Sequence, residues 1–181
     1  MLKTLRIIPF ALLFIVLGLS SAAQMPATPP AAKDAPAPSS KSTTIYIVRH
    51  AEKASASGDT PLSEAGTKRA ACLATTLADA KLQSIYTTEY KRTKDTAAPT
   101  AAKTGVTATV INGAEMDKLI KTLQNEPGRN VLVVGHSNTV PQIVARLGGG
   151  TVSMKDDEYD HLYIVTLRNG EATLASLRYC H

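Results

Sequence analysis

The sequence has no tryptophan and only two phenylalanines among its 181 residues, and its aromatic residues do not alternate with lysine or arginine. These absences argue against a stacking platform for nucleic-acid bases. The formal net charge of +5 does not change this conclusion, because residues 1–42 carry four of the 20 basic side chains and one of the 15 acidic ones. The other 16 basic and 14 acidic side chains nearly balance, so we expect no nucleic-acid partner.

The sequence also lacks a GxxxxGK[ST] loop and any cluster of cysteine and histidine with zinc spacing. We therefore predict neither a metal nor a cofactor. Cys72 and Cys180 are the only two cysteines. An exported chain can oxidise such a pair, but the sequence does not show whether they meet. A role for Cys72 as a small buried hydrophobic residue is the preferred interpretation.

The amino-terminal segment has the pattern of a secretory signal peptide. Lys3 and Arg6 precede an apolar run at residues 7–19, and small residues follow up to Ala23. A membrane anchor is the alternative, but the run is shorter than the roughly 20 residues that span a bilayer. We therefore predict a cleaved signal peptide at residues 1–23, export to the periplasm or the extracellular space, and no stable membrane insertion after cleavage.

Residues 24–42 are rich in proline, alanine and serine, which predicts a disordered linker. Residues 43–181 then form the folded domain. Short apolar runs, typical of strands buried in a parallel sheet, occur at 45–48, 84–87, 107–111 and 131–134. Helical patterns lie between and after them, at 63–80, 90–104, 114–125 and 138–147.

Two features refine this pattern. Pro99 predicts a kink or a break in the second helix. Two alternating segments, 161–168 and 171–179, are joined by Asn169-Gly170, which is typical of a tight hairpin. The predicted fold is an α/β class three-layer α/β/α sandwich, with a mainly parallel sheet and a C-terminal antiparallel hairpin.

Charged and polar residues follow the predicted parallel strands, where such sheets bind ligands. They include Arg49 and His50 after the first strand, Arg92 after the second and His136 after the fourth. Two guanidinium groups suit a tetrahedral dianion such as phosphate. A neutral imidazole at His50 can attack phosphorus, and His136, if charged, can stabilise the transferring group.

Four motifs carry a resemblance to a known family: RHAEK, LSEAG, EYKRTKDTA and VVGHSNTVPQIV, in this order. Over residues 43–181 the chain resembles the histidine phosphatase superfamily, which has the phosphoglycerate mutase-like fold, and its short single-domain branch. The resemblance implies that His50 becomes phosphorylated and that Arg49, Arg92 and His136 form the phosphate pocket. Ala51 is a departure, because most members have glycine there.

The resemblance also implies a proton donor beyond the third strand. Glu115 is the expected catalytic acid, with Asp117 and Glu52 as alternatives. The resulting hypothesis is a metal-independent exported phosphomonoester hydrolase that acts on a small-molecule phosphomonoester or a phosphoprotein. The alternatives are a phosphohistidine-protein phosphatase, a phosphoglycerate mutase-like phosphotransferase and a non-catalytic module that binds phosphate or sugar phosphates. The sequence predicts neither the substrate nor the oligomeric state.

Overall fold

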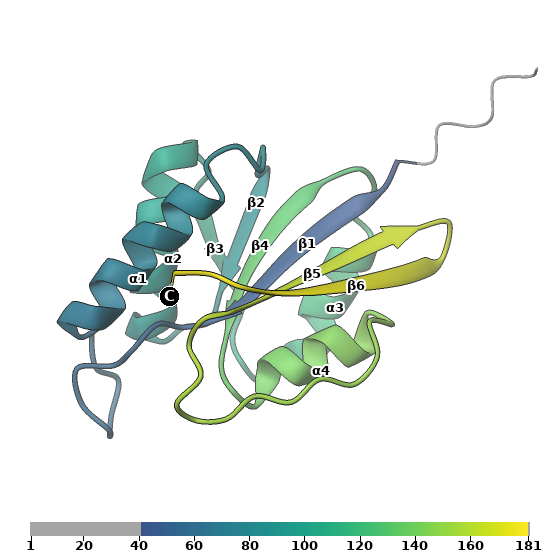
Figure 1. The fold of residues 1–181 in the computed structure, drawn as a ribbon. Coiled ribbons are helices and arrows are strands. Elements are labelled where there is room, and N and C mark those ends of the chain that lie inside the picture. Colours follow the sequence, from purple (N-terminus) through teal and green to yellow (C-terminus); the bar gives the residue numbers. More distant parts are fainter. Residues whose placement is uncertain (1–40, 181) are drawn as a thin grey trace, which may run out of the picture. The chain divides into compact units, whose positions relative to one another are not determined.

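The structure, a computed structural model, describes residues 41–180 (Figure 1). The predicted signal peptide lies outside the described residues, as do His181 and all but the last two residues of the predicted linker. Within the described range, no helix combines the length and the apolar character needed to cross a membrane.

Within residues 41–180, six strands form one sheet in the order β3-β2-β4-β1-β5-β6. The strands are β1 (Thr43–Arg49), β2 (Ser84–Thr87), β3 (Ala108–Val110), β4 (Asn130–Gly135), β5 (His161–Arg168) and β6 (Glu171–Arg178). The first four pair in parallel, whereas β5 runs antiparallel to both β1 and β6. Asn169 and Gly170 both have positive φ angles, of 54° and 82°, as the predicted tight hairpin requires.

The helices are α1 (Glu64–Thr76), α2 (Lys91–Thr104), α3 (Met116–Gln124) and α4 (Thr139–Arg146). They cover the two faces of the sheet in pairs (Figure 1). Leu73 of α1 and Ala97 of α2 pack in one apolar cluster, against residues such as Leu132. Leu123 of α3 and Ile143 of α4 pack in the other. The predicted α/β/α sandwich is confirmed.

Two predictions about local structure need correction. Pro99 does not divide its helix into two pieces, because α2 runs unbroken from Lys91 to Thr104. Cys72 is not simply a buried hydrophobic residue, because it forms a disulfide with Cys180 across a Cα–Cα distance of 6.2 Å. The pairing could not be inferred from spacing, since 108 residues separate the two cysteines. It fastens the segment after β6 to α1.

Candidate active site

The carboxyl ends of the parallel strands bring four of the predicted residues into one pocket. Arg49 is the last residue of β1, and His50 follows it. His136 directly follows β4, whose last residue, Gly135, pairs with Arg49. Arg92 comes from the first turn of α2. These four side chains line a common open pocket, together with Lys53, Ala56, Ser137, Asn138, Asp156 and Tyr159. The rings of His50 and His136 have their centroids 5.3 Å apart.

The ring of His50 is held in one orientation by the backbone of the next residue. The side chain is buried, and Nδ1 lies 2.8 Å from the carbonyl oxygen of Ala51. A carbonyl only accepts hydrogen bonds, so Nδ1 carries the proton and Nε2 keeps its lone pair. Ala51 accommodates this arrangement without a left-handed backbone conformation, and its N–H donates to Thr96 Oγ1 at 2.9 Å. Alanine in place of glycine therefore introduces no φ strain.

The Arg49 guanidinium joins the pocket to the segment that precedes β5. Nη1 donates to the carbonyl oxygens of Lys155, Asp156 and Glu158 at 3.1, 2.9 and 3.3 Å. The carbon of the guanidinium group lies 4.1 Å from the centre of the Tyr159 ring. Nε is buried and has no hydrogen-bond partner within the described residues. Arg49 thus holds the loop and still has donor capacity for an anion.

Arg92 has a similar aromatic neighbour. Its guanidinium carbon lies 4.3 Å from the centre of the Tyr90 ring, and that ring also meets His136 edge-on at 5.3 Å. The nearest acidic group recorded for it is Asp59, whose Oδ1 is 3.9 Å from Nη1. Buried Nε again has no hydrogen-bond partner within the described part of the chain. Each pocket arginine is therefore stacked on a tyrosine and incompletely paired.

Both pocket histidines are neutral at neutral pH. The pKa of His50 is lowered to about 3, chiefly by burial and also by the charges of His136, Arg49 and Arg92, whereas the hydrogen bond to Ala51 acts in the opposite direction. The pKa of His136 is lowered to about 4, chiefly by burial and also by the charge of Arg92, whereas the charge of Glu89 acts in the opposite direction. The Nε2 lone pair of His50 is therefore available as a nucleophile without prior deprotonation.

The structure does not bring the predicted proton donors to this pocket. Glu115 caps α3, is exposed and pairs with Lys118 at 3.2 Å. Asp117 pairs with Arg146 on the surface. Glu52 accepts from Arg69 at 2.7 to 3.0 Å through both carboxylate oxygens. None of the three lines the pocket, and Asp156 is the only acidic residue that does so among the described residues.

Several pocket residues were missed by the sequence analysis. Lys53 follows the first motif closely, so its proximity to His50 was a usable signal. Asp156 and Tyr159 lie in the acidic loop before β5, and only the Arg49 hydrogen bonds reveal that this loop closes one side of the pocket. Glu89 does not line the pocket, but its charge raises the pKa of His136, and its side chain accepts from the Gly113 N–H at 2.8 Å.

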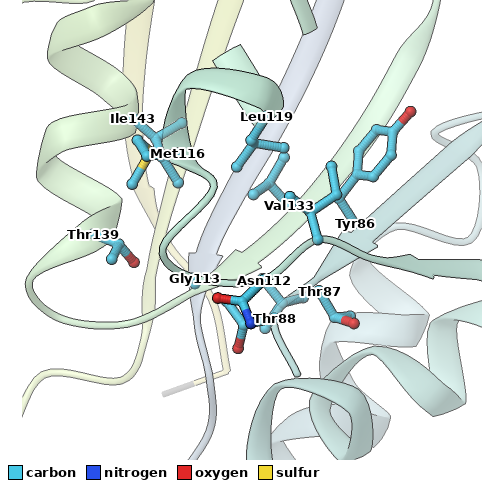
Figure 2. A pocket seen from close by; sticks show the side chains of 13 residues that line it. Tyr86, Thr87, Thr88, Asn112, Gly113, Met116, Leu119, Val133, Thr139 and Ile143 are labelled. Carbon is cyan, nitrogen blue, oxygen red and sulfur yellow. The ribbon is translucent and has the colours of Figure 1, made fainter. Parts of the chain in front are cut away.

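A smaller, mainly apolar cavity is lined by Thr88 (Figure 2). Its volume of about 20 Å³ is about what one water requires. In Figure 2, Thr88, Asn112 and Gly113 lie at one end, and Met116, Leu119 and Ile143 lie at the other. Thr88 Oγ1 is also 3.0 Å from Nε2 of His136, which lines the phosphate pocket, so Thr88 contacts a residue of that pocket.

Comparison with known proteins agrees with the fold and the motifs. The family model of the histidine phosphatase superfamily (branch 1) matches residues 45–117. No curated protein matches the sequence at a significant level. Among solved structures, the protein histidine phosphatase SixA in complex with tungstate is similar, with a TM-score of 0.62 and 22% identity over 75% of this chain and 96% of that one.

Two further solved structures have the same fold. The α-ribazole phosphatase from Shigella flexneri has a TM-score of 0.62 at 17% identity, covering 75% of this chain and 96% of its own. A phosphoglycerate mutase from Bacillus anthracis has a TM-score of 0.61 at 18% identity, covering 76% and 93%. The architecture is thus that of phosphoglycerate mutase-like proteins. The resemblance to the histidine phosphatase superfamily that the motifs predicted is confirmed by the family-model match over residues 45–117 and by the shared fold.

Proposed function

We propose that this chain is a phosphomonoester hydrolase that works through a phosphohistidine at His50. The observation that carries the proposal is the fixed orientation of His50: Nδ1–H donates to Ala51, and Nε2 keeps its lone pair in a pocket with two guanidinium groups. The buried, unpaired Nε atoms of Arg49 and Arg92 fit the binding of an anion. Superfamily relatives include phosphatases and a mutase, which supports phosphoryl chemistry.

The reaction would proceed in two displacements. Nε2 of His50 attacks phosphorus as the ester P–O bond breaks, and the leaving oxygen takes up a proton from solvent water. The ring then carries a positive charge, which the hydrogen bond from Nδ1–H to Ala51 stabilises. Water next attacks phosphorus, the P–N bond breaks, and inorganic phosphate and neutral His50 are released. Arg49, Arg92 and His136 would bind the phosphoryl oxygens through both steps.

The positions of the acidic residues bear on which leaving groups the enzyme could release. Because Glu115 does not line the pocket, the proposal assigns it no step. A substrate whose leaving group is stable without a proton, such as an aryl phosphate, needs less assistance than an alkyl phosphate. We therefore expect hydrolysis to fall steeply as the leaving group becomes more basic. Either a small phosphomonoester or a phosphoprotein remains compatible with the open pocket.

Export is part of the same proposal. The charged, apolar and small-residue pattern of residues 1–23 supports a secretory signal. The Cys72–Cys180 disulfide gives independent support, because such bonds persist in oxidising compartments. Expression of the full chain with and without residues 1–23, followed by fractionation, tests this point: retention of both forms in the cytoplasm would overturn it.

The test of function begins with p-nitrophenyl phosphate. We expect vanadate-sensitive release of phosphate that persists in a chelator and is lost in His50→Ala. Brief incubation with labelled substrate should give an acid-labile phosphoryl adduct in the wild type but not in His50→Ala. His161→Gln, which lies outside the pocket lining, is the matched control and should keep full activity.

A non-catalytic phosphate-binding module is the second candidate, favoured by the positions of Glu115 and Asp117 outside the pocket. Equilibrium binding of inorganic phosphate separates the two functions. Binding without turnover of aryl phosphates or of a phosphorylated imidazole would favour the module. Turnover that is confined to the phosphorylated imidazole would instead favour a phosphohistidine-protein phosphatase.

A further inference from the structure

Two buried threonine hydroxyls form a chain next to His136. Thr88 directly follows β2, and its Oγ1 lies 3.0 Å from Nε2 of His136. The same oxygen is 2.9 Å from Oγ1 of Thr93, in the first turn of α2. Thr88 and Thr93 have only 9% and 0% of their surface exposed. Water therefore has little access to this group of hydrogen bonds.

The direction of donation in this chain follows from its far end. Oγ1 of Thr93 lies 2.8 Å from the carbonyl oxygen of Tyr90 and 3.1 Å from that of Thr88. Carbonyl oxygens only accept, so the single Thr93 hydroxyl hydrogen points to them. Thr93 must then accept from Thr88, whose own hydrogen is used in that bond. Thr88 is left to accept, and the donor to it is Nε2–H of His136.

We propose that Thr88 is a positioning residue that holds His136 as the Nε2–H tautomer and leaves Nδ1 as the nitrogen available to the phosphate pocket. The backbone assists, because the His136 N–H donates to Thr139 Oγ1 at 2.8 Å. The tautomer is a property of the free protein. Its catalytic consequence rests on the proposed phosphatase function.

The Nδ1 atom then has a defined role toward a ligand. In the neutral ring Nδ1 carries a lone pair, so it can take the proton of a phosphate monoanion as this binds. The resulting imidazolium donates from Nδ1 to a phosphoryl oxygen while Nε2–H still donates to Thr88. With the opposite tautomer, Nε2 would have to accept from a hydroxyl whose hydrogen is already committed to Thr93.

The apolar cavity strengthens this dependence on one hydroxyl. Thr88 lies at the polar end of a cavity otherwise lined by residues such as Ile111, Leu119 and Ile143 (Figure 2). A valine at position 88 would keep the shape of the side chain but offer no acceptor. Nε2–H would then face apolar atoms, and an unsatisfied buried donor is unfavourable. The ring would respond by changing tautomer or orientation.

Nitrogen NMR of the imidazole rings tests the proposal without any substrate. Long-range ¹H–¹⁵N spectra of the full chain, with His136→Asn used to assign the signals, should show His136 as Nε2–H in the wild type and in Thr88→Ser. Thr88→Val should shift the ring toward Nδ1–H. Thr87→Val is the matched control, because the neighbouring Thr87 hydroxyl is buried and has no hydrogen-bond partner within the described residues. It should leave the tautomer unchanged.

Two results would overturn the inference: a wild-type ring protonated only at Nδ1, or an unchanged tautomer in Thr88→Val. If Thr88→Val does not fold, Thr93→Val serves in its place, because it frees the Thr88 hydrogen and should weaken the preference for Nε2–H. Kinetics add a readout that a structural role would not move. We expect kcat in Thr88→Val to fall about tenfold, the factor that one hydrogen bond commonly supplies, and to recover in Thr88→Ser.

These results separate the inference from the proposed function. If the tautomer responds as expected but no variant, including the wild type, turns over a phosphate ester, the phosphatase proposal fails and the positioning of His136 stands. If the wild type is an active phosphatase and the tautomer does not respond, the positioning role is wrong and the function stands.

Discussion

At the scale of single residues, Arg49 combines a structural role with the proposed role in binding an anion. One terminal nitrogen, Nη1, is committed to three backbone carbonyls of the loop before β5, and the guanidinium plane stacks on Tyr159. Lysine has one ammonium group in place of this planar fork. It could not hold the loop and face an anion at the same time. The pocket and its loop therefore depend on the same guanidinium.

The buried neutral state of His50 should be visible in the pH dependence of stability. In the unfolded chain its pKa is about 6.5, whereas in the folded protein it is about 3. Between these values the unfolded state binds the extra proton, so stability falls as pH decreases from 6.5. The slope from this residue approaches about 1.4 kcal/mol per pH unit. Urea denaturation at pH 7.0 and 5.5 should show a smaller loss for His50→Gln than for the wild type; equal losses would contradict the burial argument.

The stacking of Arg92 on Tyr90 gives a second residue-scale prediction. An exposed cation–π contact contributes about 0.5–1 kcal/mol, so Tyr90→Ala should weaken competitive inhibition by inorganic phosphate by about two- to fivefold. Tyr90→Phe keeps the ring, so inorganic phosphate should inhibit this variant as strongly as it inhibits the wild type. Inhibition constants measured with p-nitrophenyl phosphate decide the point. Equal constants for Tyr90→Ala and the wild type would show that the ring does not position the guanidinium.

Pocket residues that directly follow a strand could be predicted from the sequence, whereas those in a longer loop that folds back could not. Arg49, His50 and His136 could be placed together because the ends of adjacent parallel strands must meet at one edge of the sheet. Tyr159 reaches the pocket only through a loop whose path is set by hydrogen bonds to Arg49. Glu115 was expected there by analogy, but the chain after β3 holds it at the exposed start of α3.

At the scale of elements, the start of α1 supports the segment that follows His50. Ser63 caps the helix by accepting from the Gly66 N–H at 3.1 Å, and its own N–H donates to the Glu52 carbonyl oxygen at 2.9 Å. Arg69, farther along the helix, pairs with the Glu52 side chain. The helix start in the LSEAG motif is thus confirmed, and it also anchors Glu52, two residues beyond the proposed nucleophile.

Gly66 should be irreplaceable at this contact. A Cβ at this position would lie 2.2 Å from the Glu52 carbonyl oxygen. Alanine would favour the helix by about 1 kcal/mol, but the overlap requires a backbone shift, so we expect Gly66→Ala to lower the free energy of unfolding by about 1–3 kcal/mol. Phosphatase activity should fall as well. Chemical denaturation measures the loss.

A matched change at the exposed neighbour separates helix propensity from packing. Ala65→Gly removes a methyl group in the same turn and should cost about 0.5–1 kcal/mol without affecting activity. An unfolding free energy for Gly66→Ala equal to or above that of the wild type would show that α1 can move away from Glu52 at no cost.

Helix α2 shows why local signals alone can mislead. Pro99 removes one backbone hydrogen bond and disfavours a helix interior, which is why a kink or a break was expected. The buried residues Thr93, Thr96, Ala97 and Thr100 nevertheless form one stripe at helical spacing. Packing of this stripe against the sheet and α1 outweighs the local preference. Such tertiary support cannot be read from the proline itself.

At the scale of the whole described domain, the disulfide joins elements that are far apart in the sequence. Cys72 lies in α1, and Cys180 follows the last strand. Next to it, Arg69 Nη1 donates to the Cys180 carbonyl oxygen at 3.1 Å, and Tyr179 is buried. The carboxyl-terminal segment, α1 and Glu52 thus form one connected unit. The covalent link closes a loop that contains most of the domain.

Removal of this link should destabilise the protein as a whole. Cross-linking residues 108 apart restricts the unfolded chain strongly, so Cys72→Ala/Cys180→Ala should lower the free energy of unfolding by about 2–4 kcal/mol. A reductant should lower the Tm of the wild type to near that of the double variant and leave the variant unchanged. Because the bond acts mainly on the unfolded chain, the folded double variant should retain its His50 chemistry at low temperature. A wild-type Tm that does not respond to reduction would show that this bond contributes nothing to stability.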